Sequence, residues 1–199
     1  MLLVGLLGQP DKEAQQRAST ALWRMVKENP DSIKTIAASG DPAELVALLR
    51  NGSVAAKDYA LWSLSLSINP ESVKVIVSEG GIRPLVNSLD SQNIRVKEQS
   101  ASALSLLASA EQIKLVAGGD LPTQIAIAKE GGIAPLIALL DIDMGSEECQ
   151  VRAAAALSDL AQRPENKEAI MAAGGIAPLV ALLSDGGASA KMRAAKALA

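Results

Sequence analysis

The chain has 199 residues, a length that suits one ordinary domain or a short array of repeats. Apolar residues make up 49 % of it but aromatic residues only 2 %, so Ala, Leu, Val and Ile must form the core, as they do where helices pack closely. The net charge of −3 does not indicate nucleic acid or a membrane as a partner, and no apolar run reaches the length of a membrane span. The single Cys149 excludes an internal disulfide and fits the reducing cytoplasm or nucleus.

The first predicted element is a short helix at 3–7. Its sequence, LVGLL, stands 42 residues before the LVALL at 45–49, and related segments begin at Leu85, Leu136 and Leu179. The stretch lacks the basic region and the cleavage site of a signal peptide. We therefore interpret it as the second helix of a repeated unit.

A longer helix follows each of these segments. Its apolar positions recur at i, i+4 and i+7, which is the pattern of a helix with one face towards a core. These positions are Ala18, Leu22 and Met25, then Ser100, Leu104 and Leu107, then Ala153, Leu157 and Leu160. In a fourth copy, Ala60 and Leu64 begin the same stripe before Ser67 interrupts it.

A glycine ends another short helical stretch in each unit, as glycine commonly does at helix C-termini. An Ile stands four residues before each of these glycines, and a break such as ENPDS at 28–32 or INPES at 68–72 precedes most of them. The pairs are Ile36 and Gly40, Ile76 and Gly80, Ile127 and Gly131, and Ile170 and Gly174.

The phrase EGGIRPLV at 79–86 returns as EGGIAPLI at 130–137 and as AGGIAPLV at 173–180. We predict that each unit contains a short helix from the GGIAP segment, a second helix from LVALL and a long third helix, joined by turns rich in Gly, Pro, Asn and Asp. No stretch shows sustained strand alternation. One such unit cannot bury its apolar face alone, so the units must stack into an all-α solenoid.

These residues resemble armadillo repeats over essentially the whole chain. GGIAPLVALL, RAAAALSDLAQRPENKEAIMAAGG and ALWSLSLSINPESVKVIVSEGG carry the resemblance, and they are similar above all to the near-regular repeats of plant, fungal and protist proteins. The resemblance implies a right-handed superhelical scaffold that binds another protein or a peptide in a concave groove lined by the third helices. HEAT repeats do not account for the Gly-Gly-Ile-x-Pro phrase, and ankyrin repeats are shorter.

On this interpretation residues 1–199 form a single armadillo-repeat solenoid that is cut at both ends, as in a fragment of a longer protein. A partial repeat at 1–40 precedes repeats at 41–80, 81–131 and 132–174, and a second partial repeat occupies 175–199. The segment 110–122 carries about eight residues more than the family pattern of ~42 residues needs, and we expect it to lengthen a turn. A smaller insertion occupies 141–148.

The sequence offers no catalytic group of residues. Without His, no Ser–His or Cys–His pair and no ordinary zinc site can form, and neither GGD at 118–120 nor NGS at 51–53 has the spacing of a phosphate loop. DIDMGSEE lacks the distal Glu of a calcium loop, so we interpret it as an acidic surface loop. Cys149 is expected to be a small buried residue. We therefore expect no enzyme, no metal and no cofactor.

The resemblance also implies which residues line the groove. In the family a Trp on the third helix, an Asn four residues later and a polar residue three before the Trp face the ligand. Carried over unit by unit, these positions are Arg17, Thr20 and Arg24; Tyr59, Trp62 and Leu66; Gln99, Ser102 and Leu106; Arg152, Ala155 and Asp159; and Arg193 and Lys196.

The Trp–Asn ladder with which nuclear-import receptors hold basic peptides survives only at Trp62, and Leu66 replaces its Asn. The charged groove positions are basic except for Asp159, which favours an acidic or acidic-apolar peptide. The alternatives are a receptor of basic peptides and an engineered or excised repeat fragment with no function of its own. Trp62 either anchors a ligand or covers the edge of the core. The Arg residues either bind a ligand or are ordinary solvated surface. We expect Trp23 to lie off the groove face and to pack against other residues of the protein.

The two ends are predicted to associate, because an uncapped solenoid exposes its core. The residues concerned are Leu2, Leu3, Val4, Leu6 and Leu7 at one end and Met192, Ala195 and Leu198 at the other.

Overall fold

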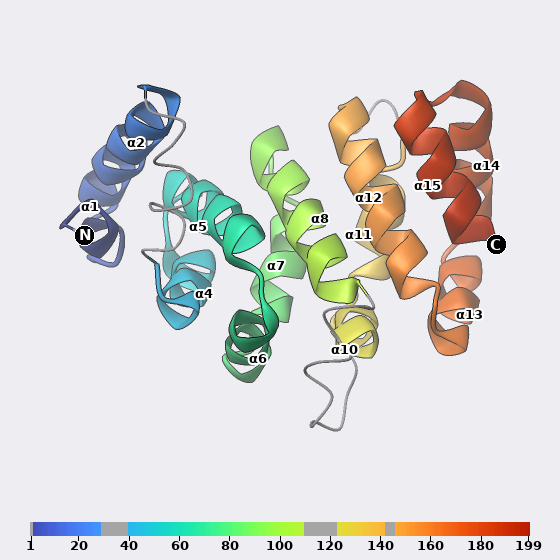
Figure 1. The fold of residues 1–199 in the computed structure, drawn as a ribbon, viewed down its shortest axis with the longest axis horizontal. Coiled ribbons are helices and arrows are strands. Elements are labelled where there is room, and N and C mark those ends of the chain that lie inside the picture. Colours follow the sequence, from blue (N-terminus) through green and yellow to red (C-terminus); the bar gives the residue numbers. More distant parts are fainter. Residues whose placement is uncertain (1, 29–39, 110–122, 142–145) are drawn as a thin grey trace.

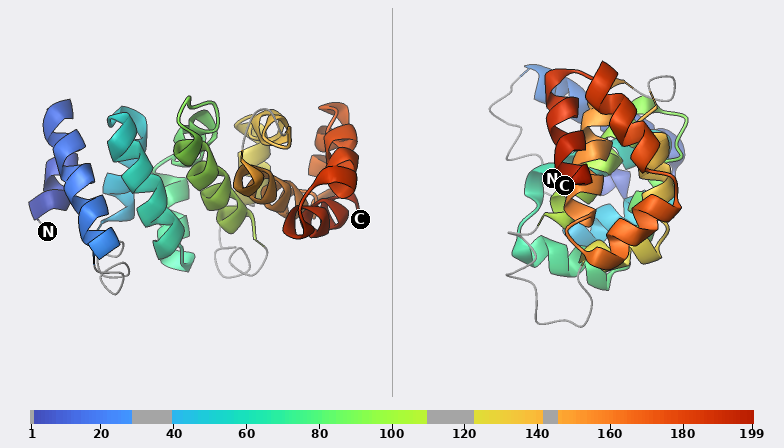
Figure 2. Two further views of the ribbon diagram at one scale, coloured as in Figure 1. Left: turned by 90° about the horizontal axis from the view of Figure 1, so that it is seen from above. Right: turned by 90° about the vertical axis from the view of Figure 1, so that its right-hand side faces the viewer.

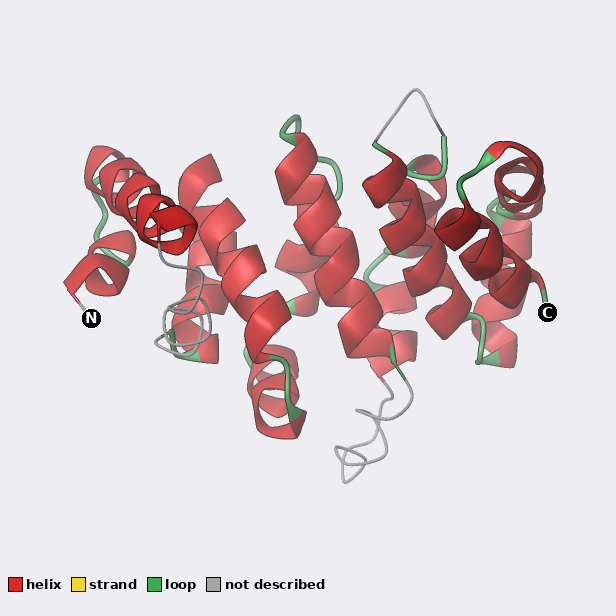
Figure 3. Cartoon of the chain, turned by 45° about the horizontal axis from the view of Figure 1, so that its top comes forward, coloured by secondary structure: helices red, strands yellow, loops and turns green. Residues whose placement is uncertain are grey.

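The computed structural model describes residues 2–28, 40–109, 123–141 and 146–199, and within these ranges the regular structure is entirely helical (Figures 1 and 3). The predicted all-α solenoid is confirmed. The helices are α1 Leu2–Leu7, α2 Lys12–Glu28, α4 Pro42–Asn51, α5 Val54–Ser67, α6 Pro70–Ser78, α7 Ile82–Ser88, α8 Ile94–Ala108, α10 Thr123–Lys129, α11 Ile133–Ala138, α12 Glu147–Leu160, α13 Pro164–Ala172, α14 Ile176–Asp185 and α15 Ala188–Leu198.

The long helices α2, α5, α8, α12 and α15 lie side by side in a row that runs from one end of the molecule to the other (Figure 1). We call the surface that they form the third-helix face. The second helices α4, α7, α11 and α14 pack behind this row, and the short helices α6, α10 and α13 border it; Figure 2 shows the same stack from above and from its end. Each third helix contacts the next one in the row, so the core is continuous along the stack.

The Gly-Gly pair is a helix stop. Gly80, at φ +63°, follows α6 in the left-handed region that favours glycine. The next amide, that of Gly81, donates to the carbonyl of Ile76 at 2.7 Å, which closes the six-to-one bond of a Schellman motif. Gly131 and Gly174 repeat the conformation, with φ of +82° and +78°. The Ile four residues before each of these three glycines is therefore the residue whose carbonyl accepts the capping bond, whereas Ile36 of the fourth predicted pair lies outside the described residues.

The structure corrects the expected order of helices within a unit. The GGIAP segment is not a helix of its own, because Gly81, Gly132 and Gly175 are N-caps and the helices that they begin run on through the LVALL segments as α7, α11 and α14. The short first helix is instead the one that ends at the Gly-Gly pair. Pro70 and Pro164 open two of these helices at positions where a missing amide costs nothing, as the breaks before them predicted.

The predicted core stripe is present in four units. Ala18, Ala60, Ser100 and Ala153 are no more than 1 % exposed, and small residues at this position let adjacent third helices approach closely. Cys149 is fully buried, as expected.

The expectation for Met25 is wrong, because its side chain is 46 % exposed. The equivalent Leu107 and Leu160 are buried in the units where α10 and α13 pack against α8 and α12. Among the described residues no such helix covers Met25. The insertion at 110–122 lies outside the described residues. In the smaller insertion at 141–148, the side chain of Ser146 caps α12 by accepting a hydrogen bond from the amide of Cys149.

Two adjacent glycines allow the helix stop to be tested. In Gly131→Ala the new methyl group meets open space, so only the positive φ opposes it, and we expect a loss of about 1 kcal/mol of stability. In Gly132→Ala the methyl group would lie 2.8 Å from Ile127 Cγ2 and 3.0 Å from its carbonyl oxygen, so we expect a larger loss, of roughly 1–3 kcal/mol. Urea denaturation of both variants measures the difference.

Gly131→Asn and Gly5→Ala are the controls. Asn tolerates the left-handed region and should recover part of the loss. Gly5 lies in α1 with open space around it, so Gly5→Ala should stabilise the protein by up to about 1 kcal/mol. Unchanged stability in Gly131→Ala would show that the backbone conformation does not matter for stability.

Candidate functional site

Three aromatic rings from two neighbouring third helices meet on the third-helix face. The ring centroids of Trp23 on α2 and Trp62 on α5 are 5.0 Å apart at an interplanar angle of 58°. Tyr59, one turn before Trp62, lies 6.0 Å from it at 43°. Tilted pairs at these distances stabilise a protein by about 0.5–1.5 kcal/mol more than the burial of their surface alone. The two Trp residues are the only ones in the chain.

Arg95 extends this group of rings to a third helix. Its guanidinium carbon lies 4.4 Å from the centroid of the Trp23 ring, and its Nε lies 3.6 Å from Asp58 Oδ2. The Arg95 side chain is 53 % exposed, so the cation can also contact a ligand. We call Trp23, Asp58, Tyr59, Trp62 and Arg95 the aromatic cluster. It joins α2, α5 and α8.

Two polar atoms of the aromatic cluster are buried without a hydrogen-bond partner, namely Trp23 Nε1 and Asp58 Oδ1. Burial raises the pKa of Asp58, the guanidinium of Arg95 opposes that effect, and the charge of Glu98 adds to it. A buried carboxylate that is only partly compensated destabilises the free protein. A ligand that forms a hydrogen bond with either of these two atoms would remove the cost of leaving it unpaired.

The groove residues expected in the first two units have different environments. Trp62 is half-buried inside the aromatic cluster, and Leu66, one turn further along α5, is 50 % exposed. Tyr59 is only 1 % exposed, so the structure places it in the core and not on a surface that a ligand could reach. Thr20 and Arg24 are exposed, and Arg17 pairs with Glu13 across one helical turn at 2.5 Å.

In the later units the expected groove residues mostly bond to one another. Arg152 Nη1 donates to Ser102 Oγ at 3.1 Å, and its Nε pairs with Glu148 at 2.7 Å. Ser102 is buried, whereas Gln99, Leu106 and Arg193 are half-buried; Ala155, which the family pattern also placed here, is 7 % exposed.

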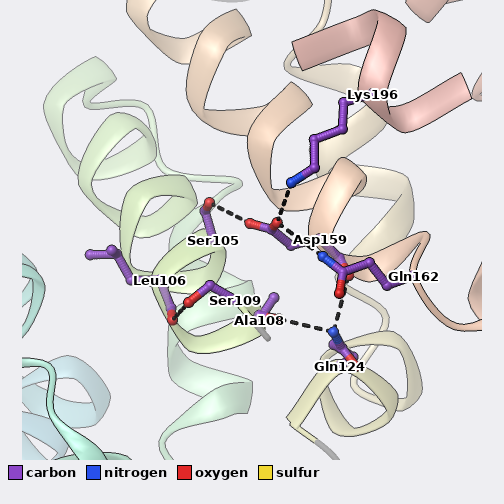
Figure 4. A network of polar contacts seen from close by, with 8 residues as sticks. All are labelled: Ser105, Leu106, Ala108, Ser109, Gln124, Asp159, Gln162 and Lys196. Carbon is purple, nitrogen blue, oxygen red and sulfur yellow. Dashed lines mark hydrogen bonds and ion pairs between the residues drawn. The ribbon is translucent and has the colours of Figure 1, made fainter. Parts of the chain in front are cut away.

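Asp159 is the centre of a polar network that connects α8, α12 and α15 (Figure 4). Its carboxylate accepts hydrogen bonds from Ser105 at 3.2 Å and Gln162 at 3.4 Å and pairs with Lys196 at 3.5 Å. Below it, Gln124 of α10 donates to the carbonyl oxygens of Ala108 and Asp159. Asp159 and Lys196 therefore hold neighbouring units together.

Sequence reasoning missed three members of the aromatic cluster. Trp23 does pack, as expected, but it packs against Trp62 and so belongs to the same surface feature. Asp58 and Arg95 occupy positions outside the family's groove pattern, and their interaction crosses from one unit to the next. The signal in the sequence was weak, because Trp23 and Arg95 are 72 residues apart.

Charge is unevenly distributed over the molecule. The five helices of the third-helix face contain eleven Lys or Arg residues and seven Asp or Glu residues, whereas the whole chain has a net charge of −3. The sequences of these five helices are therefore basic relative to the rest of the protein. Three of the predicted groove cations, Arg17, Arg152 and Lys196, already have carboxylate partners.

Comparison with known proteins identifies the fold. Residues 69–109 match the Armadillo/beta-catenin-like repeat. The chain is similar to the designed armadillo repeat protein YIII(Dq)4CqI, with 26 % identity and a TM-score of 0.73 over 99 % of this chain and 79 % of that one. It is also similar to the designed armadillo repeat protein YIII(Dq.V1)4CPAF in complex with the peptide (KR)4, with 27 % identity and a TM-score of 0.71 over the same shares.

An engineered protein is 32 % identical at a TM-score of 0.73, over 99 % of this chain and 46 % of that one. No curated protein matches the sequence. The fold is thus an armadillo repeat solenoid, but these matches do not support a particular likeness to plant, fungal or protist proteins. Among the described residues, no single helix has the length and apolar content of a membrane span.

The raised pKa of Asp58 gives a prediction with a definite sign. Because the folded state holds the proton more tightly than the unfolded state, the contribution of Asp58 to stability falls as pH rises above its ordinary value of 3.8. Asp58→Asn removes the buried charge but keeps the shape. We expect the variant to be at least as stable as the parent at pH 7, and the difference to shrink at a pH below that ordinary value.

Urea denaturation at both pH values tests this expectation, with the exposed Asp90→Asn as the control. A loss of more than about 1 kcal/mol at pH 7 in Asp58→Asn would mean that the pairing with Arg95 outweighs the cost of burial.

Proposed function

We propose that this armadillo solenoid is a scaffold that binds an extended acidic-apolar peptide along the third-helix face, with Trp62 as the anchor. The observation that carries the proposal is the aromatic cluster, in which a half-buried Trp62 is fixed by Trp23 and Tyr59 beside the exposed guanidinium of Arg95. The solved complex of a designed armadillo protein with a peptide supports a peptide as the class of ligand.

Trp62 has the properties of a binding hot spot. Aromatic residues that are held rigidly and become fully desolvated on binding contribute most of the energy at interfaces. Contacts with the rings of Trp23 and Tyr59 restrain Trp62 before a ligand arrives, so little side-chain entropy remains to be lost. Leu66 lies one turn further along the same helix and extends the apolar surface.

The excess of Lys and Arg on the third-helix face supports carboxylates in the ligand. Arg95 is the cation nearest to the anchor, and its distance of 3.6 Å from Asp58 leaves it able to pair more closely with a second carboxylate. A peptide with an apolar side chain on Trp62 and an acidic side chain towards Arg95 satisfies both groups.

A basic peptide is the competing ligand, favoured by two observations. The designed relative was solved with (KR)4, and Asp58 Oδ1 has no hydrogen-bond partner. Against it stand the cation of Arg95 beside Asp58 and the Leu66 side chain where import receptors have Asn. Both peptide classes therefore belong in the test.

Intrinsic fluorescence reports directly on the anchor, because both Trp residues of the chain lie in the aromatic cluster. We expect an array of linear peptides to show selective binding of members with an apolar centre flanked by Asp or Glu, and the selected peptide to shift the Trp emission. (KR)4 is the basic probe. Trp62→Ala should weaken binding of the selected peptide about 30-fold, the equivalent of about 2 kcal/mol.

Arg95→Glu should weaken binding chiefly at low salt, since exposed charges are screened beyond about 10 Å at 0.1 M. Met171→Ser, on α13 away from this face, is the matched control and should change neither affinity nor emission. If the protein instead selects basic peptides from the array, the proposed acidic character of the ligand is wrong. Unchanged affinity together with a sharply lowered melting temperature in Trp62→Ala would show that Trp62 serves the core alone.

A further inference from the structure

Helix α7 departs from the other second helices at three neighbouring positions. Arg83 and Asn87 stand where the units of α4, α11 and α14 each have Ala, and Ser88 stands where they each have Leu. The equivalent residues are Ala43, Ala134 and Ala177 for the first position, Ala47, Ala138 and Ala181 for the second, and Leu48, Leu139 and Leu182 for the third. A repeat that folds with Ala and Leu at these positions does not need polar side chains there.

Contacts within the protein do not explain these polar residues. Ser88 is buried like the Leu residues that it replaces, and its Oγ donates only within its own helix, to the carbonyl oxygen of Pro84 at 2.8 Å. Asn87 is exposed, and its side chain has no hydrogen bond with any residue that the structure describes. Arg83 pairs with Glu130 at 2.6 Å, but its side chain is 75 % exposed, and exposed pairs add little to stability.

All three residues line a cavity of about 580 Å³ between α4 and α7, which we call the α4–α7 cavity. Its volume lies within the range of about 300–1,000 Å³ that is usual for ligand sites. The buried residues Leu49, Pro84 and Val96 give it apolar walls, and Val54, which is 55 % exposed, also lines it. A ligand in this cavity would contact both apolar and polar groups.

Three cations from three helices line the α4–α7 cavity, namely Arg50 of α4, Lys57 of α5 and Arg83 of α7. Arg50 is a departure from the repeat as well, because the two following units have Asp at its position. Its guanidinium donates to the carbonyl oxygen of Glu79, which holds it beside the Gly-Gly turn. Lys57 has no ion pair with any residue in the described part of the chain.

Two carboxylates, those of Glu130 and Asp90, complete the charged lining, so cations exceed carboxylates by three to two. Glu130 is already bound by Arg83, whereas Asp90 repels a small ion that carries only negative charge. A peptide avoids this conflict, because its main-chain amides can donate to Asp90 and Asn87 while an acidic side chain meets the cations. The mixed lining therefore favours an acidic peptide segment over a small anion.

A cavity at the equivalent place between α11 and α14 provides an internal comparison. Its volume is about 810 Å³, and it is lined by Ala177, Ala181 and Leu182, the counterparts of the three polar residues of α7. Its described lining contains no Lys or Arg. The hollow between second helices is thus a product of the repeat, whereas the polarity and charge of the α4–α7 cavity come from the departures in α4 and α7.

We propose that the α4–α7 cavity binds an acidic segment of a second protein partner, with a carboxylate of that segment among Arg50, Lys57 and Arg83. An apolar side chain of the segment lies on Val54 and its amides face Asp90. The cavity lies between second helices, whereas Trp62 belongs to the third-helix face, so the scaffold can hold two partners at once. This second site does not depend on the ligand assigned to Trp62.

Titration with the blocked tripeptide Glu-Leu-Glu, followed by NMR, tests the proposal. The amide signals of Gly80 and Asn87, which line the cavity, should shift in the parent protein and equally in Trp62→Ala. The indole signals of Trp23 and Trp62 report separately on the third-helix face. The tripeptide Lys-Leu-Lys should leave the signals of Gly80 and Asn87 unchanged. Citrate that binds as tightly as Glu-Leu-Glu would show a site for small anions and would overturn a peptide as the occupant.

The combined change Arg83→Ala, Asn87→Ala and Ser88→Leu gives α7 the residues of its counterparts, so the variant should fold like the parent. It should bind Glu-Leu-Glu at least about tenfold more weakly, because a charged partner is lost and the cavity is filled. Lys167→Ala on α13 is the control, since it also removes one positive charge but lies outside the cavity lining.

Unchanged affinity in the combined variant overturns the proposal, as does the absence of shifts at Gly80 and Asn87 in the parent protein. Circular dichroism establishes that the combined variant is folded. If it is not, Arg83→Ala alone repeats the test, because that position is exposed and has Ala in the other units.

Discussion

The Gly-Gly turn between the first and second helices of a unit is the constraint on which the rest of the structure depends. Its first glycine adopts a positive φ so that the helix can end, and its second donates to the carbonyl of the Ile four residues before the first. The second glycine also has no room for a side chain, because the Ile of the helix before it and a branched residue of the preceding unit both pack there. The Gly-Gly dipeptide thus ends one helix, begins the next one and provides the surface on which the preceding unit packs.

Stacking of this kind makes every contact local to adjacent units, and the features of the third-helix face arise between units. The aromatic cluster combines residues from three third helices, and the Asp159 network connects α8, α12 and α15. Neither could form within one repeat. A surface that spans several units presents an extended row of side chains, which is the shape that suits an extended peptide and not a compact small molecule.

The same locality explains the ends. Residues in a repeated position are buried only if a neighbouring unit is present, so one sequence motif yields core residues in the middle of the stack and exposed apolar residues at its last unit. Charge is decided both within and between units, because Arg17 and Arg152 pair with carboxylates one turn away on their own helices, whereas Lys196 of α15 pairs with Asp159 of α12.

The sequence by itself determined the all-α solenoid, most of the core stripe on the third helices and the glycines Gly80, Gly131 and Gly174 that end first helices. Helical periodicity and the conformational freedom of glycine fix these features within a single element. Only the tertiary structure decided that Tyr59 is buried, that Met25 is not, and that Arg95 reaches Trp23. The physical reason is that a 3.6-residue period shows which face of a helix is apolar, but the rotation and spacing of neighbouring helices decide which side chains on that face meet.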